Sequence, residues 1–201
     1  MTADDLLKIA AVLVALSGWF KVFYDHRVSR PKIIGRVLSV IKGDMTFPDG
    51  SKAISYFVYP YLLNASKSSV HILDFELLVQ ISFLGGWMKV KKIYGADTLN
   101  PTFKSPGGGD IRFHGFGDRV IIGEKTLVQF GVPLHGWLPF ARPTDCVKKE
   151  RAKFKLVCTD AYGTKHVIKL NEKEDVGLPL LMELSGIELP EDMLNGRATM
   201  I

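Results

Sequence analysis

The feature that most constrains this chain is an uncharged apolar stretch near its N-terminus. "IAAVLVALSGWF" runs from Ile9 to Phe20, and Lys8 and Lys21 stand on either side of it. A helix rises about 1.5 Å per residue, so the two lysines are only about 20 Å apart, less than the thickness of a hydrocarbon core. Lysine side chains can extend toward the headgroups, however, and the wider stretch 6–24 approaches the roughly 20 residues of a spanning helix. Residues 6–24 therefore predict a transmembrane helix.

The flanks of this stretch do not fit a cleaved secretory signal, which begins with a basic region and ends in small residues. Here Asp4 and Asp5 come before the stretch, and "KVFYDHR" follows it at 21–27. The positive mean hydropathy of +0.13 agrees with membrane association. We therefore expect residues 1–28 to form a membrane anchor. Two alternatives stay open, namely a helix that lies in the membrane interface and a core helix of a soluble fold.

Basic residues gather on the C-terminal side of the apolar stretch. Between positions 21 and 42 a single acid, Asp25, stands against Lys21, Arg27, Arg30, Lys32, Arg36 and Lys42. By the positive-inside rule this excess keeps the C-terminal part of the chain in the cytoplasm. We therefore expect a single-pass protein of the cell membrane that contacts the bilayer through residues 6–24 and has a cytoplasmic β-domain.

After Pro31 the chain reads as an antiparallel β-domain. "IIGRVLSVI" (33–41) and "AISYFVYPYLL" (53–63) are strand-like runs, and Pro48-Asp49-Gly50 between them supplies tight-turn chemistry. Gly163 likewise fits a turn between two strands near the C-terminal end. Further short apolar runs with no long helix between them favour a β-sandwich, with strands expected at 70–83, 88–94, 119–123, 126–132, 135–140, 153–159 and 166–170.

These patterns divide the chain into an anchor (1–28), a β-sandwich (29–172) and a C-terminal helical tail (173–201). Helical spacing in "VGLPLLMELSGIELPEDML" predicts a short helix whose apolar face consists of Leu180, Leu181, Leu184 and Ile187. We expect this segment to pack against a sheet edge; the alternative is a partner-binding peptide.

Three stretches carry a family resemblance: "YPYLLNASKSSVHILDFELLV", "GVPLHGWLPF" and "FKLVCTDAYGTKHVI". Their order over about 32–170 resembles immunoglobulin-like or fibronectin-type sandwiches of the late-embryogenesis-abundant-14-like sort, which are often attached to bacterial envelopes. The resemblance implies a sandwich fold and an adhesive or accessory role. It transfers no catalytic residue.

No catalytic, cofactor or metal site is predicted. The glycine-rich "SPGGGD" and "HGFGD" lack the strand and helix context of phosphate-binding loops. Asp110, His114 and Asp118 recur at every fourth position, but the glycines around them oppose a helix that would bring them together. We expect the histidines of the strand-like runs to be surface or packing residues: His71, His135 and His166.

Three further features are expected to have no catalytic or binding role. Cys146 and Cys158 are expected to be reduced thiols, with one disulfide bridge as the alternative. The lysines at 89–92 and the run 147–153 are expected on solvated strand edges, so nucleic acid is not an expected partner. Asn64 begins a formal glycosylation sequon, which the predicted cytoplasmic location would leave unused.

The function predicted from these observations is a non-enzymatic, membrane-tethered module that binds an unidentified protein near the bilayer. One alternative is a hydrolase with its site in the 95–118 loop and at His135. The other is a module that binds lipid or nucleic acid.

Overall fold

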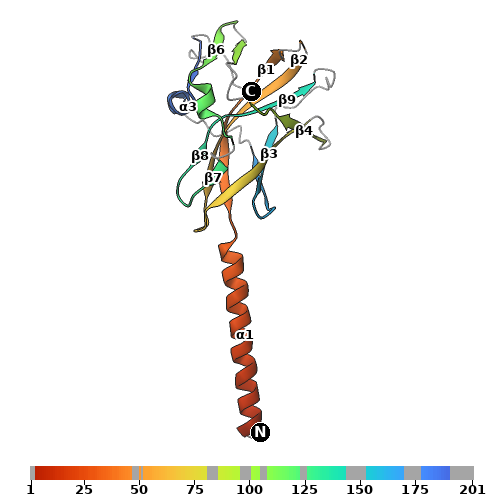
Figure 1. Ribbon diagram of the computed structural model, residues 1–201, viewed down its shortest axis with the longest axis vertical. Helices are drawn as coiled ribbons and strands as arrows, with labels where there is room; N and C mark the ends of the chain where they lie inside the picture. Colours follow the sequence, from red (N-terminus) through yellow and green to blue (C-terminus); the bar gives the residue numbers. More distant parts are fainter. Residues whose placement is uncertain are drawn as a thin grey trace.

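The computed structural model describes residues 3–46, 50, 52–80, 86–95, 101–104, 108–122, 126–143, 153–169 and 178–190. Most of the described chain is β-structure, preceded by one long helix (Figure 1). The elements are α1 (Ala3–Ser29), β1 (Ile33–Thr46), β2 (Lys52–Asn64), β3 (Val70–Gln80), β4 (Trp87–Lys92), β5 (Thr102–Lys104), β6 (Asp110–Phe113), α2 (Phe116–Arg119), β7 (Leu127–Val128), β8 (Leu134–His135), β9 (Leu138–Pro143), β10 (Phe154–Asp160), β11 (Lys165–Lys169), α3 (Leu178–Ser185) and β12 (Ile187–Glu188).

Helix α1 projects from one end of the β-domain as a single rod (Figure 1). Asp4 and Asp5 lie in its first turn, where negative charge is favourable at the positive end of the helix dipole. The helix ends at Ser29 because Pro31 disfavours helical backbone at the residue before it. The predicted N-terminal helix is confirmed, and it is longer than the apolar stretch that predicted it.

The predicted hairpin at the start of the β-domain is also confirmed. β1 and β2 pair in antiparallel register from Ile33 opposite Asn64 to Thr46 opposite Lys52. In the turn, Gly50 has a φ of 80°, a conformation that glycine adopts without strain. Gly163, with a φ of 76°, lies in the turn between β10 and β11. Both turn glycines therefore adopt the backbone that the sequence predicts for them.

The main sheet has the strand order β1-β2-β9-β4-β3-β10-β11, with β7 paired to β3 and β8 to β2. It curls until β1 contacts β11, so the two ends of the path meet and the sheet is close to a barrel. The mainly β prediction is therefore confirmed. The single curled sheet does not confirm the two facing sheets of an immunoglobulin-like sandwich.

Alternate residues of β2 belong to two separate apolar cores. Tyr56 and Val58 point into the curled sheet, whereas Phe57 and Tyr59 belong to a second core outside it. Both faces of β2 are therefore buried. Aromatic rings make up much of the second core, contributed by Phe57, Tyr59, Phe103, Phe113, Phe116 and Trp137.

A small second sheet, with strand order β12-β6-β5, covers the outer face of β2 together with α2 and α3. Ile187 of β12 is buried in the second core, and Leu184 of α3 packs against it. The described part of the predicted tail is therefore built onto the β-domain through an edge strand of the small sheet.

The region before β7 differs from the prediction. In place of a strand at 119–123, Arg119 ends the short helix α2, and Val120 makes a single bridge to Trp137. For the glycine- and proline-rich segment 95–118 the sequence leaves two possibilities open, a mobile loop or a segment that lies across one sheet. Its described part contains β5, β6 and most of α2, and these pack across the outer face of β2. Phe103 and Phe113 are buried beside β2, and this burial holds β5 and β6 in place. Contacts between residues so far apart in the sequence are not visible in a local pattern.

Candidate functional site

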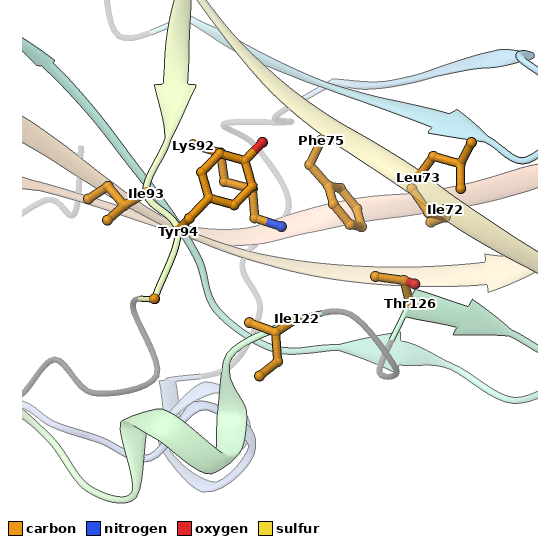
Figure 2. Close-up of a pocket in the computed structure, with 9 residues that line it drawn as sticks. Ile72, Leu73, Phe75, Lys92, Ile93, Tyr94, Ile122 and Thr126 are labelled. Carbon is orange, nitrogen blue, oxygen red and sulfur yellow. The ribbon is translucent and has the colours of Figure 1, made fainter.

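A hollow opens where β3 and β4 separate. The two strands pair only over 77–80 and 87–90, after which Lys91 and Lys92 pair with β9. Beside the gap is a hollow of about 550 Å³, and Figure 2 shows side chains from β3 and from the end of β4 around it. Most of its lining is apolar: Ile72, Leu73, Phe75, Lys92, Ile93, Tyr94, Gly95, Ile122 and Thr126.

Lys92 is the cation in this apolar lining. Its Nζ atom lies 5.3 Å from the centroid of the Phe75 ring and 6.0 Å from that of Tyr94. It donates a long hydrogen bond of 3.5 Å to the carbonyl oxygen of Ile121. Burial lowers the pKa of Lys92, and the charge of Asp74 opposes this change. Lys92 therefore presents a partly desolvated positive charge in the hollow.

The neighbouring Lys89 has a different environment. Its ammonium group pairs with the carboxylate of Glu76, whereas the ion pairs of the described residues include none to Lys92. The basic cluster in the sequence does not by itself distinguish Lys92 from Lys89. Strand alternation could have revealed the difference, because Lys92 shares a face with the buried Val90 while Lys89 and Lys91 point to solvent.

The hollow suits a group that is negatively charged at one end and apolar at the other. Desolvation strengthens the attraction of Lys92 for an anion, and Phe75 and Ile72 offer apolar contact beside it. At its border Tyr94 is 81% exposed and Leu73 is 69% exposed. This arrangement can bind an acidic and apolar surface.

The residues considered for a metal site lie in β6, in the turn after it and in α2. Asp110 begins β6, His114 follows β6, and Asp118 lies in the four-residue helix α2. His114 Nε2 is 2.9 Å from Glu188 Oε2 on β12. Across the described ranges, no group of three or more His, Cys, Asp or Glu side chains is placed to hold a metal ion.

His135, the other residue of the hydrolase alternative, pairs with Tyr59. Its Nδ1 atom is 2.8 Å from the Tyr59 hydroxyl, which donates to the carbonyl oxygen of Leu184 at 2.7 Å. Burial lowers the pKa of His135, with a further contribution from Arg119. Burial also raises the pKa of Tyr59 to about 12. His135 and His114 thus have separate partners, and the pair with Tyr59 joins β8 to β2 and α3.

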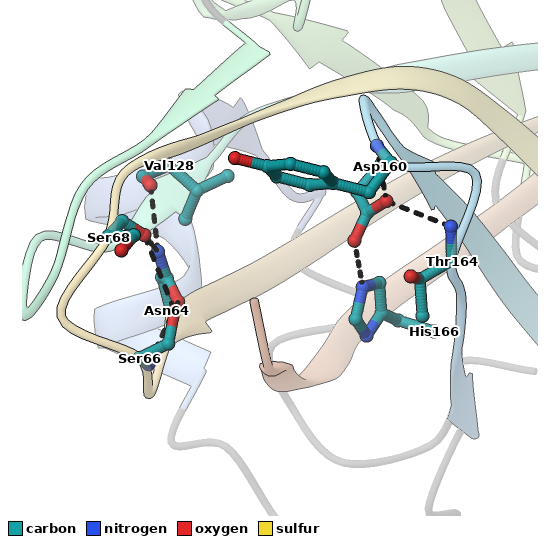
Figure 3. Close-up of polar contacts among 8 residues, drawn as sticks. Asn64, Ser66, Ser68, Val128, Asp160, Thr164 and His166 are labelled. Carbon is teal, nitrogen blue, oxygen red and sulfur yellow. Dashed lines mark hydrogen bonds and ion pairs between the residues drawn. The ribbon is translucent and has the colours of Figure 1, made fainter. Parts of the chain in front are cut away.

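A buried pair in the β10–β11 hairpin was not found from the sequence (Figure 3). His166 Nε2 lies 2.9 Å from Asp160 Oδ2, while Asp160 Oδ1 accepts hydrogen bonds of 2.9 Å from the backbone N–H groups of Tyr162 and Thr164. Asp160 is fully buried. These bonds hold the turn, so we assign the pair a structural role. The motif D-x-x-x-T before a strand-like run is the only sequence signal for it.

Asn64 is used in a second polar network of Figure 3. Its Nδ2 donates to the carbonyl oxygens of Ser68 at 2.6 Å and Val128 at 3.1 Å, and its Oδ1 accepts from the backbone N–H and hydroxyl of Ser66. The residue is 2% exposed. Its amide is therefore buried and bonded, so in the folded domain the sequon is closed to a modifying enzyme.

Of the two cysteines, only Cys158 lies within the described residues. Cys158 is a free thiol buried in the core of the curled sheet, and burial raises its pKa to about 12. Cys146 lies outside the described residues, as do 147–152 of the second basic run. The state of the pair therefore stays a prediction.

Fold and site together define a mainly β protein with one N-terminal helix that is long and apolar enough to cross a membrane. No known protein-family model matches the chain. Two curated relatives from Mycobacterium tuberculosis are similar to it: "Uncharacterized protein MT0090" of strain CDC 1551 / Oshkosh and "Uncharacterized protein Rv0083" of strain ATCC 25618 / H37Rv. Each is 26% identical over 149 residues, which cover 68% of this chain. The chain spans 23% of the length of either relative.

Proposed function

We propose that the protein is a non-enzymatic module, tethered to a membrane by α1, that binds a protein partner close to the bilayer. The observation that carries the proposal is the exposure of α1. Its described apolar side chains face solvent from Ile9 to Tyr24, and Val14, Trp19 and Phe20 are 71%, 76% and 77% exposed. Within the described chain the apolar part of α1 is not buried at all. A bilayer is the environment that stabilises such a helix.

Alkaline carbonate extraction of native membranes tests the tether. We expect the full-length protein to remain in the membrane pellet. A variant with Leu13→Arg and Leu16→Arg should move to the soluble fraction, because each central arginine costs roughly 2.5–3.5 kcal/mol on insertion. Lys21→Arg, which keeps the charge at the end of the helix, is the matched control and should stay in the pellet. Release of the unaltered protein by carbonate would contradict the tether.

We also propose that the β-domain lies on the cytoplasmic side of the membrane. The support is the excess of basic residues that follows the apolar stretch, within the distance over which such residues set topology. A cytoplasmic location agrees with the reduced, buried thiol of Cys158.

The hollow at Lys92 is the proposed contact point for the partner. Exposed aromatic side chains beside a desolvated charge are typical of the residues that contribute most to protein interfaces. Tyr94 supplies the ring, and Lys92 supplies the charge. The partner would present an acidic side chain flanked by apolar ones.

Site-specific crosslinking tests this contact in native membranes. A photoreactive amino acid at position 94 should give an adduct of one defined mass, and Lys92→Glu should abolish that adduct because it reverses the charge in the hollow. Lys89→Glu is the control, since Lys89 lies on the opposite face of the strand and should leave the adduct intact. An adduct that survives Lys92→Glu would rule out the hollow as the contact.

The immunoglobulin-like relationship of the β-domain stays a prediction from the three quoted stretches. A hydrolase would need His135 and His114 to converge on one pocket, whereas each is bonded elsewhere, to Tyr59 and to Glu188. We therefore prefer the non-enzymatic proposal.

A further inference from the structure

Three turns lie at the end of the β-domain from which α1 emerges (Figure 1). The first, at 65–69, begins beside the helix, because the Ala65 N–H donates to the carbonyl oxygen of Lys32 at 2.9 Å. The second, at 129–133, is joined to it by a bridge between Asn64 and Phe130. The third, at 161–164, is held by a bond of 2.9 Å from the Ala161 N–H to the carbonyl oxygen of His71. We call these three turns the proximal rim.

The proximal rim exposes large apolar side chains. Phe130 is 59% exposed, Val132 is 52% exposed and Tyr162 is 71% exposed. They come from two turns that are far apart in the sequence. Exposed apolar side chains that gather at one end of a domain indicate a contact surface.

The charges of the rim favour an anionic surface. Lys67 is exposed in the first turn, Lys32 is exposed where the chain enters the domain, and no acid occurs in the rim sequences "ASKSS", "QFGVP" and "AYGT". Basic residues close to an anionic membrane surface are attracted to it. Apolar and aromatic tips next to lysines match the chemistry of a lipid headgroup layer.

The position of α1 sets the distance from the rim to the bilayer. Ser29 lies five residues beyond Tyr24, which is about 7.5 Å along a helix. A bilayer is roughly 40–45 Å thick and its hydrocarbon core about 30 Å, which leaves a headgroup layer of about 5–7.5 Å on each side. The helix beyond Tyr24 is therefore about as long as one headgroup layer is thick. Pro31 is already buried in the β-domain, so the connection to the rim is short. The rim therefore faces the headgroups directly.

We propose that the proximal rim rests on the membrane, with Phe130, Val132 and Tyr162 contacting the lipid headgroups and Lys32 and Lys67 facing anionic lipids. The inference rests on the tether proposed above. As a consequence, the orientation of the β-domain relative to the membrane is fixed, and the hollow at Lys92 is held at a defined distance from the membrane surface. Lys92 pairs with Phe140 of β9, which in turn pairs with Tyr56 of β2. Tyr56 precedes Asn64, at the rim end of β2, by eight strand residues, so Lys92 and the nearby position 94 are about 26 Å from the rim.

Depth-dependent quenching in vesicles tests this contact. The full-length protein, with Cys146→Ser, receives a single fluorescent label at Phe130→Cys, Tyr162→Cys or Tyr94→Cys, and is reconstituted in phosphatidylcholine and phosphatidylglycerol with headgroup spin-labelled lipid. We expect the labels at 130 and 162 to lose fluorescence and to shift their emission to the blue. The label at 94, the matched exposed tyrosine position, should stay unquenched and water-exposed.

Carbonate extraction of the same vesicles separates this proposal from the tether. If the protein is retained in the vesicles but the labels at 130 and 162 are as water-exposed as the label at 94, the rim contact is wrong and the tether is supported. If the protein is released while the labels at 130 and 162 are quenched beforehand, the rim contact is supported and the tether is wrong. Release with unquenched labels overturns both.

Discussion

The hydroxyl of Tyr59 donates a hydrogen bond of 2.7 Å to the carbonyl oxygen of Leu184, which joins the middle of the β-domain to the last turn of α3. Arg119 donates to the same oxygen, and the indole N–H of Trp137 donates to that of Ser185 at 2.8 Å. The last carbonyls of a helix have no partner inside the helix. Side chains of the second core supply them here, so α3 is bonded to the domain as well as packed on it.

We predict that Tyr59→Phe lowers the free energy of unfolding by about 1–2 kcal/mol, because it removes the hydrogen bond to Leu184, whose oxygen keeps its second donor Arg119, and also the pairing with His135 Nδ1. Urea unfolding of the full chain in detergent, followed by circular dichroism, measures the change. Tyr61→Phe on the same strand is the control. Tyr61 stacks on His135 but its hydroxyl makes no hydrogen bond to the described residues, so we expect almost no change. Equal effects at the two positions would contradict the role given to the Tyr59 bond.

A second prediction compares two glycines with positive φ. Gly186, which follows α3, has a φ of 67°, and a Cβ atom there would lie 2.5 Å from the carbonyl oxygen of His114. Gly163 has a φ of 76° and open space around the same position. We expect Gly163→Ala to cost about 1 kcal/mol from backbone strain alone, and Gly186→Ala to cost about 3 kcal/mol because the backbone must also move.

Thermal unfolding measures both costs, and limited proteolysis shows whether α3 loosens in Gly186→Ala. The open site at Gly163 serves as the control for the strain that the two substitutions share. Similar melting temperatures for the two variants would mean that the second core yields easily around α3.

The parts of the fold that the sequence predicts correctly depend on local chemistry. The hairpin around Gly50 follows from turn residues between two β-branched runs, and the limits of α1 follow from acidic residues at one end and Pro31 at the other. The curl of the sheet, which brings β1 to β11, depends on contacts between distant strands and leaves no local pattern.

The errors have the same physical origin. The run "RVIIG" predicts a strand, but its described residues form no strand. Val120 is buried with Trp137 in the second core, and Ile121 is buried in the core of the curled sheet. Phe57 and Tyr59 are buried on the outer face of β2 only because a segment distant in the sequence folds over them. The hollow at Lys92 escaped detection because it forms where two strands separate, which depends on the path of β4 toward β9.

The buried pair of Asp160 and His166 leads to a pH prediction. Burial raises the pKa of Asp160, but hydrogen bonds from His166, Thr164 and Tyr162 lower it more, so its pKa is below the ordinary value of 3.8. A carboxylate with a lowered folded pKa stabilises the fold above its unfolded pKa and loses that contribution as the pH falls through the folded pKa. We expect Asp160→Asn to reduce the free energy of unfolding by about 1 kcal/mol at neutral pH.

That difference between the unaltered protein and Asp160→Asn should be constant from neutral pH to about pH 4 and should shrink below it. Chemical unfolding of both proteins over this pH range provides the measurement, and subtraction cancels the other carboxylates. A difference that shrinks between pH 7 and pH 5 instead would assign the titration to another group.

The last prediction concerns the side of the membrane on which the β-domain lies. Cys158 cannot report it, because its thiol is buried and its pKa is raised to about 12, so it reacts slowly in the folded protein on either side. Tyr94 is 81% exposed, and Tyr94→Cys in a Cys146→Ser background supplies an accessible thiol. If the β-domain lies in the cytoplasm, as we propose from the basic residues that follow the apolar stretch, a membrane-impermeant maleimide applied to intact cells should leave this thiol unlabelled and should label it after lysis. Cys158 should react only after denaturation, which controls for the integrity of the fold. Labelling at position 94 before lysis would place the domain outside, and the search for its partner would then move to that side.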